Sequence, residues 1–213
     1  MLFALLILLI VVPRALSQVP DDRLIVPGQR IGKWTLEMSV DDLVRMNGGD
    51  YFENKDTSED LRSELLFRYW LHLALLAGYR RGQTRIEYLG STGGALIFPS
   101  GAPTRMALKE KYPDIVLIHT QSSILLSPPA RLAYQTANGI GLNYDITPQK
   151  VIEAFGAPTG EAIVTLGKAV WSRMTYDEIG IAFGFEPDAG GRPRFLRNIS
   201  VFRPKIGRNI WKF

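Results

Sequence analysis

The fold is decided by Met38-Ser39-Val40-Asp41-Asp42-Leu43 and by a second stretch of the same kind, Ile146-Thr147-Pro148-Gln149-Lys150-Val151. In each stretch a hydroxyl residue, Ser39 or Thr147, stands where the N-cap of a helix is expected, because its oxygen can accept a hydrogen bond from a backbone N–H that has no partner inside the helix. An apolar residue precedes each cap and another follows it by four positions, which is the spacing of a hydrophobic staple. Each stretch therefore predicts the start of a short helix.

A glycine ends each predicted helix. Gly48 and Gly156 stand where the chain leaves the helix in a conformation that glycine adopts easily, so the helices cover residues 39–47 and 147–155. Two copies of one helix-starting unit favour a tandem repeat. We therefore expect an α+β fold made of two related units, each with short helices packed on antiparallel sheet.

The second unit is assigned residues 129–213, with strands after its helix over about 161–173 (bent near Gly167), 178–185 and 195–203. The middle strand alternates between large apolar and small residues. The large residues are Ile179, Ile181, Phe183 and Phe185, and the small ones are Gly180, Ala182 and Gly184. Alternation with a period of two predicts that the large face packs on a core. The small face leaves the backbone open to a partner or to another part of the same chain.

The first unit is assigned residues 24–128, with Pro128-Pro129 as the boundary because two prolines remove two ladder donors and stiffen the link. Apolar residues at helical spacing predict an extra helix over 59–77. Strands are expected over 84–89, 95–98 and 115–120. The stretch Gly90-Ser91-Thr92-Gly93-Gly94 is expected to form the turn between the first two strands.

Residues 1–17 indicate the compartment. An uninterrupted apolar run over residues 2–12 is too short to span a bilayer and suits the core of a secretory signal, with Ala15-Leu16-Ser17 as the cleavage site. Because no Lys or Arg precedes this run, an uncleaved leader that acts as a weak membrane anchor is the alternative. We expect a protein exported to the periplasm or the exterior. The chain contains no cysteine, so its core alone must stabilise it.

Basic residues are concentrated at the C-terminal end of a chain with a net charge of +4. From Arg192 onward there is no acidic residue, and the basic ones are Arg192, Arg194, Arg197, Arg203, Lys205, Arg208 and Lys212. Such a segment can contact anionic surfaces weakly, or it can simply be a solvated edge strand and terminus. Nucleic acid is not expected as a partner, because the chain lacks a known binding motif.

The sequence contains no catalytic constellation, and we expect no catalytic residue, cofactor or metal. Its two histidines, His72 and His119, lie among apolar residues and are interpreted as structural. Asp41 and Asp42 could bind a cation, but in the first turn of a helix they complement its dipole. The segment 90–94 lacks the spacing of a nucleophile elbow and a lysine for phosphate.

Three segments resemble exported bacterial proteins of unassigned function that share the fold of the outer-membrane assembly lipoprotein SmpA/OmlA and of the β-lactamase-inhibitory protein. The segments run from Ile31 to Gly48, from Tyr134 to Pro158 and from Tyr176 to Pro204. The resemblance implies small helices on an antiparallel sheet and a function in binding proteins. The chain departs from the pattern at Asn143-Tyr144-Asp145, before the second cap, and lacks the lipid-anchoring cysteine of SmpA.

The leading hypothesis is therefore a non-catalytic protein-binding or envelope-assembly module whose partner is an envelope protein. Its candidate binding residues are Trp171 and Arg173, which are of types that favour interface cores, together with the small face of Gly180, Ala182 and Gly184. Burial of Trp171 under the helices is the competing outcome. A periplasmic hydrolase whose carboxylates converge only in three dimensions is the alternative function. A carrier with an apolar cavity beneath the helix at 59–77 is a third.

Overall fold

The computed structural model describes the chain from residue 22 to residue 204 with several gaps. The described residues are 22–53, 65–70, 73, 75–92, 95–96, 116–120, 123–127, 135–141, 146–166 and 169–204. The predicted leader and the predicted boundary at Pro128-Pro129 lie outside these residues, as do the side chains of His72 and His119.

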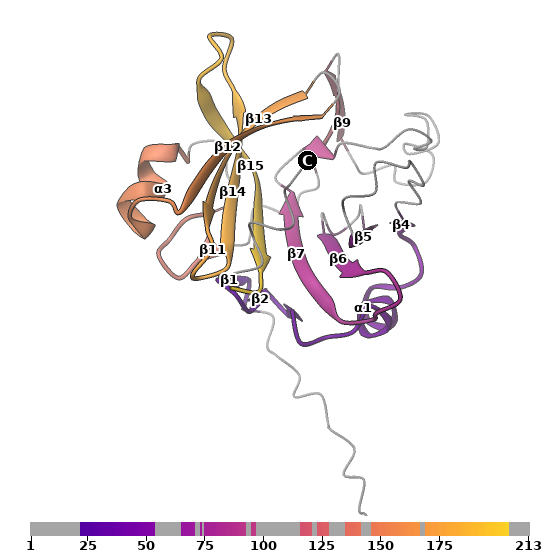
Figure 1. Ribbon diagram of the computed structural model, residues 1–213. Coiled ribbons are helices and arrows are strands. Elements are labelled where there is room, and N and C mark those ends of the chain that lie inside the picture. The colour runs from indigo at the N-terminus through magenta and orange to yellow at the C-terminus, as the bar shows by residue number, and fades with distance from the viewer. Residues whose placement is uncertain are drawn as a thin grey trace, which may run out of the picture.

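An eight-stranded antiparallel sheet forms the centre of the molecule (Figure 1). In spatial order its strands are β12 (Gly160–Leu166), β13 (Ala169–Tyr176), β14 (Ile181–Pro187), β15 (Pro193–Phe202), β7 (Ile86–Thr92), β6 (Leu75–Arg80), β5 (Leu65–Trp70) and β4 (Phe52–Glu53). Two helices accompany it, α1 (Val40–Asn47) and α3 (Pro148–Phe155). The predicted α+β class is confirmed.

The sheet consists of two related units, each a helix followed by four strands. Helix α1 precedes β4 to β7, and α3 precedes β12 to β15. The last strands of the two units, β7 and β15, pair in the middle of the sheet, so that Tyr88 lies opposite Phe202. The two units therefore share one sheet, and their helices lie far apart (Figure 1).

Corresponding hydrogen bonds hold the ends of the two helices. The carbonyl oxygen of Gly48 accepts a 3.0 Å hydrogen bond from Trp70 Nε1, at the end of β5. The carbonyl oxygen of Gly156 accepts one of the same length from the hydroxyl of Tyr176, at the end of β13. In both units, then, the second strand supplies an aromatic donor to the glycine that ends the helix.

Two smaller sheets complete the fold. One has the order β11 (Gln135–Thr136), β1 (Leu24–Val26), β2 (Arg30–Ile31) and β3 (Trp34–Thr35), and the other β8 (Ala95–Leu96), β10 (Ser123–Ser127) and β9 (Val116–Thr120). Strands β1 and β11 pair in parallel, with Leu24 opposite Gln135. Because β11 comes shortly before α3, this pair ties the start of one unit to the start of the other.

The main hydrophobic core contains residues of both units. Trp70, from the first unit, and Phe183, from the second, are fully buried in the same cluster. Phe155 of α3 packs on this core, with its ring centroid 5.3 Å from that of Phe183. A smaller cluster consists of Tyr88, Ala182 and Phe202. The units therefore have one core in common.

Both predicted helix caps are confirmed. The side chain of Ser39 accepts a hydrogen bond from the backbone N–H of Asp42, and the carboxylate of Asp42 accepts one from the N–H of Ser39, which completes a capping box. The side chain of Thr147 accepts one from the N–H of Lys150. Leu43 and Val151, the later members of the staples, are fully buried.

Replacing either cap by alanine should lower the free energy of unfolding by roughly 0.5–2 kcal/mol, because one backbone N–H loses its acceptor. Ser39→Gly should lower it by only a few tenths of a kcal/mol. The effects of Ser39→Ala and Thr147→Ala should add in the double variant, because the caps belong to distant helices. Urea unfolding of the four variants measures these changes in the free energy of unfolding. A Thr147→Ala variant as stable as the natural sequence would contradict an equivalent role for the two caps.

The helix predicted over 59–77 is wrong. Within it, residues 65–70 form β5 and residues 75–77 belong to β6, and these two strands pair antiparallel. Leu66 packs on the main core and Phe67 on the smaller cluster, so β5 is apolar on both faces and lacks the alternation that normally reveals a strand. Gly78, the residue directly after the predicted helix, lies inside β6, where a Cβ atom would come within 2.8 Å of the Phe67 ring.

Other boundaries also differ from the prediction. The strand predicted over 178–185 begins only at Ile181, because residues 177–180 form a turn, and Ile179, predicted on the core face, is 41% exposed. Gly90, Ser91 and Thr92 continue β7 instead of forming a turn, and β8 pairs with β10. The strand predicted over 161–173 is a hairpin of β12 and β13, in which Leu166 lies opposite Ala169. Gly167 and Lys168 lie between these strands, outside the described residues.

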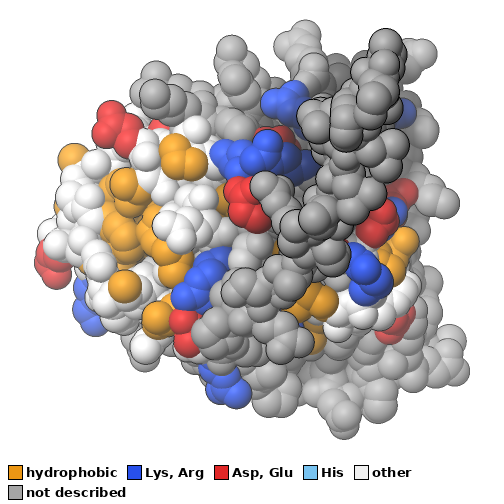
Figure 2. Space-filling model, turned by 90° about the horizontal axis from the view of Figure 1, so that it is seen from below, with side chains coloured by type: hydrophobic (Ala, Val, Ile, Leu, Met, Phe, Trp, Pro, Cys, Tyr) orange, Lys and Arg blue, Asp and Glu red, His pale blue; other side chains and the backbone are white. Residues whose placement is uncertain are grey.

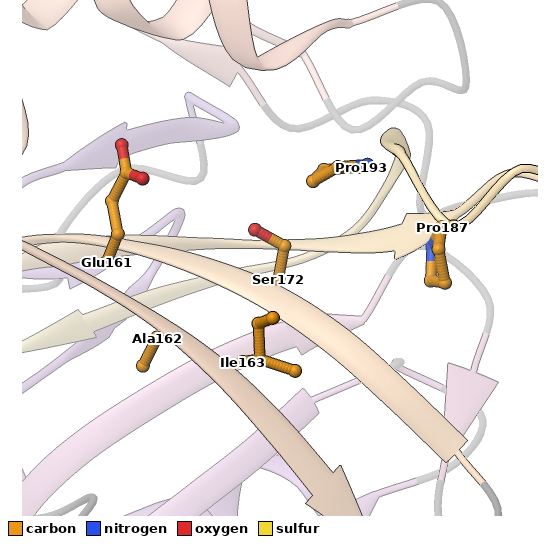
Figure 3. A pocket seen from close by; sticks show the side chains of 7 residues that line it. Glu161, Ala162, Ile163, Ser172, Pro187 and Pro193 are labelled. Atoms are coloured by element: carbon orange, nitrogen blue, oxygen red, sulfur yellow. The ribbon is translucent and has the colours of Figure 1, made fainter.

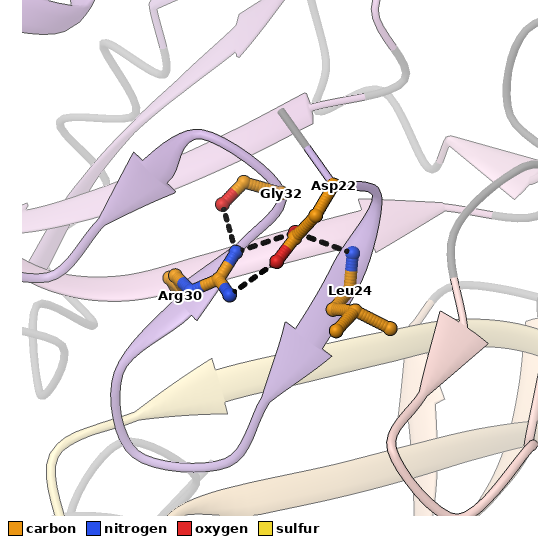
Figure 4. A network of polar contacts seen from close by, with 4 residues as sticks. All are labelled: Asp22, Leu24, Arg30 and Gly32. Carbon is orange, nitrogen blue, oxygen red and sulfur yellow. Dashed lines mark hydrogen bonds and ion pairs between the residues drawn. The ribbon is translucent and has the colours of Figure 1, made fainter. Parts of the chain in front are cut away.

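The carboxylate of Asp22 holds the chain just before β1 in place (Figure 4). Arg30 donates from Nη1 and Nη2 to the two carboxylate oxygens of Asp22, at 2.7 and 2.6 Å, and from Nη1 to the carbonyl oxygen of Gly32. The N–H of Leu24 also donates to Asp22. The hydrogen bonds from Arg30 are the main reason why the pKa of Asp22 falls from 3.8 to about 2.

This ion pair predicts a specific loss of stability in acid. Because the pKa of Asp22 is lower in the folded state, its contribution is complete above pH 3.8 and disappears as the pH falls towards about 2. The difference in urea midpoint between the natural sequence and Asp22→Asn should therefore shrink over this range. Arg30→Gln should remove the same pH-dependent difference. A difference that stayed constant with pH would contradict the assignment.

Within the described part of the chain, neither helix has the length and hydropathy needed to cross a membrane.

Candidate protein-binding site

Strand β12 forms one edge of the main sheet. As the first strand in the order, β12 has a strand neighbour only on the side of β13 among the described residues. Glu161, Ala162 and Ile163 are exposed, and Ile163 is 77% exposed, the highest value among the exposed large hydrophobic residues. The opposite edge strand, β4, is described over two residues, Phe52 and Glu53. A long, apolar edge strand presents backbone N–H and C=O groups that can pair with another chain.

A hollow of about 310 Å³ lies beside this edge (Figure 3). Its lining residues are Glu161, Ala162, Ile163, Ser172, Pro187, Gly191 and Pro193. They come from four strands and from the turn between β14 and β15. The lining is largely apolar, with the carboxylate of Glu161 and the hydroxyl of Ser172 as its polar groups. It can receive a side chain of a bound segment, and its described lining residues include one carboxylate, that of Glu161.

The turn that borders the hollow is held by Asp188. Its carboxylate oxygen Oδ1 accepts hydrogen bonds from the N–H groups of Gly190 and Arg192, at 2.8 and 3.0 Å. The hydrogen bond from Arg192 is the main cause that lowers the pKa of Asp188. The N–H of Asp188 also donates to the carbonyl of Arg192. These bonds fix the wall of the hollow that Gly191 and Pro193 form.

The structure buries Arg173, one of the predicted binding residues. Arg173 is 6% exposed, and its desolvation lowers the pKa of its guanidinium to about 9, against the opposing influence of Tyr88 and Asp177. The backbone of Trp171 lies in β13, opposite Val164, and its side chain lies outside the described residues. Arg173 is therefore not part of an open surface.

The small residues of the second unit are buried by the same chain, so the expectation of a flat face open to a partner is corrected. Gly180 lies against Gly28 of the first unit, whose N–H donates to its carbonyl oxygen at 3.0 Å. Asn198 covers Gly184, where a Cβ atom would lie 2.8 Å from its Nδ2. Ala182 belongs to the smaller cluster and is 1% exposed. Of the two alternatives left open by the sequence, close approach by another part of the chain is the one observed.

Charged side chains of both signs lie next to one another on the face shown in Figure 2, without a continuous basic patch among the described residues. Arg192 and Arg194 are exposed at the β14–β15 turn. Arg203 instead binds the first unit, donating to the carboxylate of Glu37 at 2.9 Å and to the carbonyl of Leu36. Lys205, Arg208 and Lys212 lie outside the described residues.

No three histidine, cysteine, aspartate or glutamate side chains within the described ranges are grouped to hold a metal ion. Asp41 is exposed, and Asp42 is engaged in the capping box. Ser200, in the sequon-like Asn198-Ile199-Ser200, is 2% exposed and shares a hydrogen bond with the hydroxyl of Tyr88.

The β12 edge was not predicted from the sequence, because residues 161–173 were interpreted as one bent strand and not as the hairpin of β12 and β13. A signal was present: Gly167-Lys168 separates two runs rich in β-branched residues, and glycine at the first position of a two-residue connection is typical of a type II′ hairpin. The hairpin would have revealed a shorter strand with a free side.

Comparison with models of known protein families, with curated proteins and with solved structures finds no match.

Proposed function

We propose that this protein is an exported, non-catalytic binding module that takes an extended segment of an envelope protein as an additional strand along β12. The exposed stretch Glu161–Ile163 carries this proposal, because strand addition needs free backbone groups and nearby space for alternate side chains. The hollow beside Ile163 supplies that space. The resemblance to the SmpA/OmlA and β-lactamase-inhibitory protein group, whose members bind proteins, supports the same class of function.

The hydrolase alternative gains no support from the hollow, since Glu161 is the only carboxylate among the described residues that line it. The carrier alternative required an apolar cavity beneath a helix at 59–77, and residues 65–70 and 75–77 of that segment are strand.

Site-specific photo-crosslinking in cells of the source organism tests the proposal. A photoreactive residue at position 163 should give discrete adducts with another envelope protein, which mass spectrometry identifies. The same residue at Met46, which is 42% exposed on α1, should give none of these adducts. Folded, abundant protein that gives no adduct with any other protein at position 163 would contradict the proposed function.

A further inference from the structure

We propose that, when no other protein occupies β12, its edge pairs with the same edge of a second copy, antiparallel about a two-fold axis at Ile163. This inference rests on the proposed function in one respect, the use of the β12 edge as a binding surface. It adds that a second copy of the chain controls whether another protein can reach this edge. The two eight-stranded sheets would then form one continuous sheet.

The exposed Ile163 lies at the centre of β12, so the strand is symmetric in length about it. Ile163 is the middle residue of β12, which runs from Gly160 to Leu166. In an antiparallel pair centred there, all residues of the strand have a partner, and Ile163 lies opposite itself. The exposed Ile163 side chain would thus pack on the same side chain of the second copy, and both would leave water.

The negative charge of Glu161 distinguishes between the possible registers of the pair. In this register Glu161 lies opposite Thr165 of the second copy, four residues from the position opposite the other Glu161. At about 3.3 Å per residue the two carboxylates are about 13 Å apart, beyond the screening length of about 8 Å at physiological ionic strength. Parallel pairing would place them about 5 Å apart. Antiparallel pairing centred on Ala162 would place Glu161 opposite Ile163. Charge and apolar contact therefore select the register centred on Ile163.

The unpaired backbone groups along the β12 edge favour the same arrangement. The outward N–H and C=O groups of an edge strand occur at every second residue, and pairing about a two-fold axis satisfies them on both copies at once. A single strand pair buries less than the roughly 1,200 Å² of a standard stable interface. The dimer should accordingly be weak and concentration-dependent, so that a partner segment can displace the second copy.

Cysteine trapping tests the pair and its register, because the natural chain contains no cysteine. Directly opposite residues in an antiparallel pair have Cβ atoms about 4.5–5.5 Å apart, close to the spacing that a disulfide needs. Under mild oxidation Ile163→Cys should form a covalent dimer of the purified protein. Glu161→Cys alone should not, but a mixture of Glu161→Cys with Thr165→Cys should form the mixed dimer. Met46→Cys is the control for random collision.

Two results would overturn the proposal. Ile163→Cys that cross-links no faster than Met46→Cys would exclude the pair, and Glu161→Cys that cross-links with itself as readily as Ile163→Cys would exclude the register.

Sedimentation of the natural sequence should show monomer and dimer in exchange. Ile163→Lys should raise the dissociation constant at least about tenfold, because like charges would face each other, and Met46→Lys should leave it unchanged.

These outcomes are separate from those of the proposed function. A protein that stays monomeric at all concentrations, yet gives heterologous adducts at position 163 in cells, would overturn the dimer alone. A trapped dimer without heterologous adducts would overturn the binding function alone.

Discussion

Gly180→Ala should lower the free energy of unfolding by at least about 4 kcal/mol, which is exceptional for a single methyl group. A Cβ atom at this position would overlap the carbonyl oxygen of Phe202 and lie 2.9 Å from the Cα of Gly28. Neither backbone can move away freely, since the carbonyl of Gly180 accepts hydrogen bonds from the N–H groups of both residues. With total stabilities of about 5–15 kcal/mol being typical, the variant should be largely unfolded under mild denaturant.

Gly191→Ala is the matched control for this variant. Gly191 has φ +78°, close to the +73° of Gly180, but nothing lies within 4 Å of the position that a Cβ would occupy. Its replacement should therefore cost only the backbone strain of about 1–2 kcal/mol. Urea unfolding of both variants separates steric overlap from strain. Equal losses would show that the junction between Gly28, Gly180 and Phe202 is looser than described.

Phe183→Ala and Trp70→Ala should each lower the free energy of unfolding by about 3–5 kcal/mol, because both side chains are fully buried and leave cavities. The two residues come from different units but belong to the same core. Each variant should therefore unfold in a single transition that is the same by tryptophan fluorescence and by circular dichroism.

The exposed Met46 provides the control, since Met46→Ala should change the free energy of unfolding by no more than about 0.5 kcal/mol. A second, unshifted transition in either core variant would contradict a shared core and would favour units that unfold separately.

The parts of the fold that depend on neighbouring residues could be predicted. Ser39 and Thr147 accept their capping hydrogen bonds from residues three positions later, and the N–H groups of Gly48 and Gly156 donate to carbonyls four positions earlier, so the pattern alone revealed them. The core face of β14 was also predictable, because Phe183 and Phe185 alternate with small residues and are fully buried.

The parts that depend on distant contacts could not be predicted. Strand β5 packs on both faces, so the alternation that identifies a strand is missing, and its apolar residues imitated a helix. The small face predicted over 178–185 gave no sign that Gly180 would lie in a turn before β14 and be covered by Gly28. For the same reason the candidate binding site was placed on this buried face, whereas the open edge lies two strands away, at β12.

The central pairing of β7 with β15 also determines when the molecule can fold. Tyr88 and Ser200, which share a hydrogen bond across this pair, are 112 residues apart in the sequence. Closing so long a loop is entropically costly, and sheets dominated by such contacts form slowly. The middle of the sheet cannot close until the last strand has been synthesised. A chain under synthesis therefore lacks its central strand pair until β15, which ends at Phe202, has emerged from the ribosome.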